Sequence, residues 1–135
     1  MILAIYVDDM IPISNSKSML TEEKLKLQQK FDMVDNGEVS YILGMLVKRD
    51  RGKKLLSISQ GNYLNNVLKR FNMENCKSCS TPLDVGRQFR KIDESDERFD
   101  ATLYQQAIGC LTYAAITTRP DIAAAVGIFS QFVSP

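Results

Sequence analysis

Two adjacent aspartates interrupt an apolar stretch near the start of this 135-residue chain. Residues 2–7 are apolar and rich in strand formers, Asp8 and Asp9 follow, and a second apolar run covers residues 10–13. This pattern predicts a β-hairpin that carries both carboxylates at its turn. Hard divalent cations prefer such oxygen ligands, so the turn is a candidate Mg²⁺ site. The alternative is that Asp8 and Asp9 form only a polar hairpin turn.

Beyond this hairpin, segments with helical spacing of apolar residues alternate with short strand-like runs. The predicted helices cover residues 19–31, 60–71, 101–116 and 119–132, and the predicted strands cover residues 31–34, 41–48 and 54–58. Asn36-Gly37 is expected to be the turn of a second hairpin, while Ser59 and Thr118 are expected to cap helices. These elements indicate an α+β fold, with a small antiparallel sheet and packing helices followed by a helical segment.

The composition excludes several classes of function. The chain has no histidine, which removes Ser-His-Asp and Cys-His catalysis and imidazole zinc sites, so any chemistry has to use carboxylates or metals. With a net charge of +1, the chain as a whole does not attract a polyanion electrostatically, so contacts with nucleic acid have to be local. The apolar stretches are too short to cross a bilayer, and no membrane segment is expected.

The cysteines also favour a reducing environment. The chain has three of them without a regular disulfide framework, which is typical of an intracellular protein. Cys76 and Cys79 have the spacing of half a zinc site, but only Cys110 remains to complete it. We therefore interpret these cysteines as incidental.

A series of short motifs runs in order over nearly the whole chain. They are Tyr6-Val7-Asp8-Asp9, Phe31-Asp32-Met33 with Asp35 and Gly37, Leu43-Gly44, Ser59-Gln60 with Tyr63, Leu68 and Phe71-Asn72-Met73, Thr81-Pro82, Tyr104 with Ile108-Gly109, Leu111 and Tyr113, and Thr118-Arg119-Pro120-Asp121-Ile122 with Ser130 and Phe132. Together, in this order, they resemble the reverse transcriptase of copia-type retrotransposons.

The resemblance implies RNA-directed DNA synthesis by two-metal nucleotidyl transfer. Asp8 and Asp9 would be catalytic residues and ligands of Mg²⁺ or Mn²⁺, and the RNA or DNA template-primer would be the partner. Tyr6 would shape the floor beneath the primer end. Leu43 and Gly44 would lie on the hairpin that grips the primer.

Basic residues gather around the third expected strand and the helix after it, where the resemblance would place a duplex. Lys48, Arg49, Lys69 and Arg70 are the candidates for phosphate contacts. The alternative is an ordinary solvated face. Arg119 has two readings of the same kind, as a residue packing locally at a helix start or as a contact to the nucleic-acid backbone.

The resemblance also implies a division of the chain into four parts. Residues 1–58 would be a partial palm with the catalytic and primer-gripping hairpins, and residues 59–75 a thumb-like helix. Residues 76–100 would form a long connection, and residues 101–135 a truncated helical pair.

Copia-type reverse transcriptases have further parts that this sequence does not contain. A third metal-binding aspartate and the fingers would precede Met1, and the ribonuclease H portion would follow Pro135. The isolated chain is therefore expected to be inactive, and its unpaired strand edges are expected to promote self-association. The alternative function is that of a translated retroelement remnant, a non-catalytic module that binds nucleic acid or protein.

Overall fold

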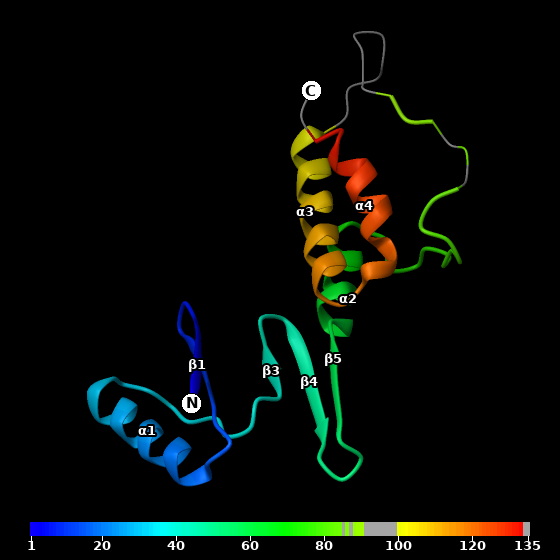
Figure 1. The fold of residues 1–135 in the computed structure, drawn as a ribbon. Helices are drawn as coiled ribbons and strands as arrows, with labels where there is room; N and C mark the ends of the chain where they lie inside the picture. The colour runs from blue at the N-terminus through cyan, green and yellow to red at the C-terminus, as the bar shows by residue number, and fades with distance from the viewer. Residues whose placement is uncertain (85, 87, 91–99, 134–135) are drawn as a thin grey trace. The chain divides into compact units, whose positions relative to one another are not determined.

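The computed structural model describes residues 1–84, 86, 88–90 and 100–133, and the chain divides into two compact units, Met1–Ser57 and Ile58–Pro135 (Figure 1). In chain order the elements are β1 (Ile2–Tyr6), β2 (Asp9–Ile13), α1 (Lys17–Lys30), β3 (Tyr41–Ile42), β4 (Met45–Asp50), β5 (Leu55–Ser59), α2 (Gly61–Arg70), α3 (Ala101–Thr117), the 3₁₀ turn η1 (Pro120–Ile122) and α4 (Ala123–Ser130). The expected α+β class is confirmed.

The strands form two small antiparallel sheets, where the sequence suggested one. β1 pairs only with β2, and the other sheet has the order β3-β4-β5. Helix α1 begins after Ser16, whose hydroxyl accepts a hydrogen bond from the Met19 N–H at 3.4 Å, and it contacts β2. No residue among the first 57 is buried. The first unit therefore lacks a core of its own.

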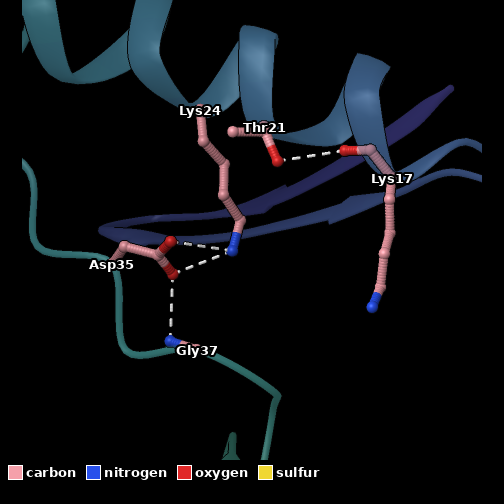
Figure 2. Close-up of polar contacts among 5 residues, drawn as sticks. All are labelled: Lys17, Thr21, Lys24, Asp35 and Gly37. Atoms are coloured by element: carbon pink, nitrogen blue, oxygen red, sulfur yellow. Dashed lines mark hydrogen bonds and ion pairs between the residues drawn. The ribbon is translucent and has the colours of Figure 1, made fainter.

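The expected strand at residues 31–34 and its turn at Asn36-Gly37 are wrong. The segment between α1 and β3 has no regular structure, because its polar groups bond locally instead of forming a ladder. The Asp35 carboxylate accepts the Gly37 N–H at 2.9 Å and binds the Lys24 ammonium at 2.8 and 2.9 Å (Figure 2). Residues 31–40 are thus tied back to α1.

The second hairpin turns seven residues later than predicted. Leu43 and Gly44 connect β3 to β4 with φ angles of 50° and 74°. Positive φ at both central residues is the requirement of a type I′ turn, which matches the twist of the paired strands. The Val47 N–H also donates to the Ser40 carbonyl at 2.8 Å. Gly44, rather than Gly37, therefore closes the hairpin.

The core lies in the second unit, between α3 and α4. Its buried apolar residues are Ile108, Ala114, Ala115, Ala125 and Val126. Three of these five residues are alanines, which allows the two helices to approach closely. The predicted helices 60–71 and 101–116 are confirmed, and the last predicted helix divides into η1 and α4 because Pro120 starts a 3₁₀ turn.

The predictions that Ser59 and Thr118 cap helices are wrong. Gln60 and Arg119 stand at the two N-cap positions, and the Thr118 hydroxyl bonds to the Gln60 side chain instead. Gln60, not Ser59, occupies the N-cap position of α2, and its side chain makes no capping bond. The Thr118 hydroxyl donates to Gln60 Oε1 at 2.7 Å. Gln60 is only 1% exposed, so this bond joins the start of α2 to the end of α3 inside the unit.

The expected long connection lies between α2 and α3. Its described residues, 71–84, 86, 88–90 and 100, contain no helix or strand, and residues 85, 87 and 91–99 lie outside the described residues. Phe89 packs edge-on against Phe129, with ring centroids 5.0 Å apart. Across the described part of the chain, every helix is too short or too polar to cross a membrane.

Candidate active site

The Asp-Asp turn is a two-residue loop of Val7 and Asp8. Tyr6 and Asp9 face each other as the last pair of the β1-β2 ladder. Val7 has φ of 51°, although a β-branched side chain strongly disfavours positive φ. Its side chain is 80% exposed and gains little from packing. The backbone therefore stores strain beside the two carboxylates, a feature that is common at functional sites.

Both carboxylates are free to accept a ligand. Asp8 and Asp9 are exposed, and their carboxylates have no ion pair or hydrogen bond among the described residues. Mg²⁺ commonly takes one or two protein carboxylates and completes its octahedron with water and substrate phosphates. Within the described ranges there is no group of three histidine, cysteine, aspartate or glutamate residues that could form a complete cage. The donor set therefore fits an open magnesium site of two adjacent carboxylates.

Tyr6 lies beside Asp9 on the sheet. Directly paired residues of an antiparallel ladder project from the same face, with Cβ atoms roughly 5 Å apart. The Tyr6 side chain is 59% exposed, so a ligand held at Asp9 could also meet the phenol ring.

The two candidate cations on β4 point to opposite faces. Lys48 and Arg49 are consecutive, and successive strand side chains alternate between faces. The neighbouring Arg51 binds Glu38 at 2.7 Å, and it lowers the Glu38 pKa with help from Arg49 and Lys17. Lys48 has no ion pair among the described residues. A ligand lying on one face would therefore meet only one of the two cations.

The two cations at the end of α2 also differ. The Arg70 guanidinium donates to Gln106 Oε1 of α3 at 2.6 Å and lies 5.7 Å from the centroid of the Phe71 ring. Lys69 is exposed, and its ammonium has no ion pair or hydrogen bond among the described residues. Arg70 is thus engaged in packing α2 on α3, whereas Lys69 faces solvent.

Two predictions remain, one for Arg119 and one for the three cysteines. Arg119 packs locally, because its guanidinium binds the Asp121 carboxylate with distances of 2.7 to 3.2 Å. Cys76 and Cys79 are free and exposed, and Cys110 is free and half-buried. Two contacts in the structure were not predicted from the sequence, namely Gln60 with Thr118 and Lys24 with Asp35. Gln60 and Asp35 do belong to the short motifs that carry the family resemblance.

The model of the reverse transcriptase (RNA-dependent DNA polymerase) family matches residues 1–85, which include the whole first unit and its Asp-Asp turn. The chain belongs to this family. The resemblance to copia-type reverse transcriptases is therefore confirmed.

Known relatives of this reverse transcriptase segment are retrotransposon proteins of plants, among others. It is 41% identical to the retrovirus-related Pol polyprotein from transposon TNT 1-94 of Nicotiana tabacum, covering 98% of this chain and 10% of the polyprotein. It is 34% identical to the Pol polyprotein from transposon RE1 of Arabidopsis thaliana, covering 97% of this chain and 9% of the polyprotein. An uncharacterized mitochondrial protein of Arabidopsis thaliana is 33% identical, covering 97% of this chain and 52% of that protein.

The reverse transcriptase segment spans about a tenth of the two polyproteins. No solved structure matches it.

Proposed function

We propose that this chain carries part of the polymerase active site of a copia-type Pol polyprotein and acts in RNA-directed DNA synthesis. The observation that carries the proposal is the pair of exposed, unpaired carboxylates at the strained turn of the β1-β2 hairpin, inside the range of the family match. The four parts expected from the sequence, residues 1–58, 59–75, 76–100 and 101–135, would be palm, thumb-like helix, connection and helical pair.

In this function Asp8 and Asp9 hold Mg²⁺ or Mn²⁺. Such ions, when bound, neutralise charge on the attacking and leaving oxygens of phosphoryl transfer. The chain's own contribution is to fix the carboxylates, because a two-residue loop between paired strands leaves little freedom for Asp8 and Asp9. Tyr6, on the same face as Asp9, offers its ring to the primer end.

The other candidate residues contact nucleic acid in this function. The tight turn at Leu43 and Gly44 presents backbone to the primer, and Leu43 is 36% exposed there. Lys48, Arg49, Lys69 and Arg70 supply phosphate contacts. Of the pair on α2, Lys69 is the stronger candidate because Arg70 is engaged with Gln106.

The rest of a polyprotein completes the site. The first unit has no buried residue, and its strands β1 and β2 each leave one edge unpaired. We infer that the fingers and the ribonuclease H portion of the polyprotein are partners, and that a third carboxylate comes from outside the described residues. Without these partners, the open edges favour self-association.

A non-catalytic binding module is the second candidate. It is favoured by the absence of a third potential metal ligand near Asp8 and Asp9 within the described ranges. Such a module would use the same basic and apolar surfaces to bind nucleic acid or protein, without synthesis.

Primer extension separates the two candidates. This chain should replace the matching segment of the TNT 1-94 polyprotein, and extension of a DNA primer on RNA should be measured with Mg²⁺ and with Mn²⁺. Asp8→Asn and Asp9→Asn should each reduce extension by roughly a hundredfold or more, since several kcal/mol of charge stabilisation are lost. Asp32→Asn, at another exposed carboxylate, is the matched control.

Metal binding by the chain itself gives an independent readout. Electron paramagnetic resonance of Mn²⁺ should show binding that Asp8→Asn and Asp9→Asn each weaken and Asp32→Asn leaves unchanged. Extension that survives both active-site substitutions would refute the polymerase assignment. Binding of template-primer without extension by any variant would favour the binding module.

A further inference from the structure

We propose that Asn36 is a modification site, at which the side-chain amide is lost spontaneously to give aspartate and isoaspartate, and that the hydrogen bond between Asp35 and Gly37 limits the rate of this loss. The proposal goes beyond the proposed function and does not depend on it. It concerns residues 31–40, the segment that the Asp35 carboxylate ties back to α1.

The local sequence favours this reaction at Asn36. Among the asparagines of the chain, only Asn36 is followed by glycine. The attacking atom is the backbone nitrogen of the next residue, so a side chain on that residue would crowd the approach. Gly37 has no side chain, and a Cβ atom placed on it would meet nothing within 4 Å among the described residues beyond its chain neighbours. The approach to Asn36 is therefore open.

The main chain leaves Asn36 and Gly37 unrestrained by secondary structure. Both residues are exposed, and they stand in a segment without helix or strand. Within the described part of the chain, no hydrogen bond between main-chain groups involves either of them. The N–H that follows Asn72, by contrast, donates to the Leu68 carbonyl at 2.8 Å. Asn36 thus combines the reactive sequence with a backbone that can change conformation.

The reaction needs water as its only co-reactant. The Gly37 nitrogen attacks Cγ of Asn36, so that a new C–N bond closes a five-membered succinimide ring. The side-chain nitrogen leaves as ammonia, taking up the proton that the Gly37 nitrogen loses. Water then adds to one of the two ring carbonyls and breaks its C–N bond. Opening at one carbonyl gives aspartate, and opening at the other gives isoaspartate.

The Asp35 carboxylate opposes the first step. It accepts the Gly37 N–H at 2.9 Å and is itself held by the Lys24 ammonium at 2.8 and 2.9 Å (Figure 2). The nitrogen has to lose this proton, and a neighbouring negative charge disfavours the resulting amide anion. The bond also spans Asn36 and holds its backbone in one turn, whereas ring closure needs a different one. Asp35 therefore acts as a positioning residue that slows the loss.

The modification would change the connection between α1 and β3. Either product adds a carboxylate next to Asp35, and isoaspartate also lengthens the main chain by one carbon. Two adjacent carboxylates compete for the Lys24 ammonium that now binds Asp35. Because the ammonia is lost to solvent, the change in this segment is one-way.

Peptide mapping of the full chain by mass spectrometry tests the site. The chain should be incubated at mildly alkaline pH and digested with trypsin at intervals, with electron-transfer fragmentation to separate aspartate from isoaspartate. Tryptic residues 31–48 contain Asn36 as their only side-chain amide, and residues 1–17 contain Asn15 as theirs. Asn15 is also exposed but is followed by serine, so its amide should be lost more slowly.

Variants test the restraint by Asp35. Asp35→Ala removes the acceptor and its charge and should speed the loss at Asn36 by about twofold to tenfold, the effect of one hydrogen bond. Asp35→Asn keeps an acceptor without the charge, so its rate should lie between those of the parent chain and Asp35→Ala. Glu38→Ala is the matched control and should leave the rate unchanged, since that carboxylate binds Arg51. In denaturant the difference between the parent chain and Asp35→Ala should disappear.

Two outcomes would overturn the proposal. Loss at Asn36 that is no faster than loss at Asn15 would exclude the modification site. Equal rates for the parent chain and Asp35→Ala under native conditions would exclude the restraint. Neither outcome bears on the polymerase assignment, because primer extension by the chimera depends on Asp8 and Asp9.

Discussion

Replacing both partners of the part-buried bond between Gln60 and Thr118 by apolar side chains should cost less unfolding free energy than replacing Thr118 alone. Gln60 Oε1 accepts the Thr118 hydroxyl at 2.7 Å, while Gln60 Nε2 is buried and has no hydrogen-bond partner within the described residues. The amide therefore combines one good bond with one unpaired donor. Removing a single partner and removing both should have different consequences.

The magnitudes follow from which atoms remain unpaired. Thr118→Val leaves Gln60 Oε1 buried without a donor, which should cost about 1–3 kcal/mol of unfolding free energy. Gln60→Met removes the unpaired Nε2 as well as the acceptor and leaves only the half-buried Thr118 hydroxyl, so it should cost about 1 kcal/mol or less. The double variant contains neither polar group and should lie within about 1 kcal/mol of the parent chain, or above it.

Native-state amide hydrogen exchange in α2 and α3 is the suitable assay, because it reports the opening free energy of the unit that holds the bond. The double-mutant cycle should give a coupling of about 1–2 kcal/mol. Thr117→Val is the matched control, since that hydroxyl bonds to Tyr113 of its own helix and should not couple to Gln60. A double variant whose cost equals the sum of the two single costs would refute the reasoning.

Two further predictions concern titratable groups. Burial raises the pKa of Tyr63 to about 12, and the hydrogen bond to Cys110 acts in the same direction. The stability that the neutral phenol contributes is therefore fully present below pH 10.0, the ordinary tyrosine pKa, and it is lost as the pH rises towards 12. Tyr63→Phe should therefore flatten the alkaline loss of helical circular dichroism, and an unchanged profile would contradict this. Lys24 and the Gly37 N–H lower the pKa of Asp35, so the tether to α1 should weaken only as pH falls below the ordinary value of 3.8. At neutral pH, hydrogen exchange in residues 33–40 should be faster in Asp35→Ala than in Asp35→Asn, because asparagine can still accept the Gly37 N–H; equal rates would exclude that bond as a determinant.

The relation between sequence and structure is clearest at the Asp-Asp turn. Two apolar runs separated by carboxylates specify a hairpin through contacts between residues only a few positions apart. Helices α1, α2 and α3 were likewise predictable, because the spacing of their apolar residues is a local property. The metal-ligand candidates and each of the short family motifs are likewise made of residues close together in the sequence, although the motifs are spread over nearly the whole chain.

The tertiary structure decided what depends on partners distant in the chain. Asn36-Gly37 and Leu43-Gly44 are both plausible turns, and the choice depended on the Asp35 carboxylate, which bonds Gly37 and reaches Lys24 eleven residues away. Gln60 became a buried linker instead of a surface residue because Thr118, 58 positions later, packs against it.

The structure also gives different surroundings to basic residues that are adjacent in the sequence. Strand alternation places Lys48 and Arg49 on opposite faces, and α3 supplies the Gln106 acceptor that engages Arg70 but not Lys69. The sequence by itself therefore determined which chemical groups this reverse transcriptase segment carries and most of its local elements. Only the tertiary structure decided which of those groups are left free to bind, because hydrogen bonds and burial depend on residues that folding brings together from far apart.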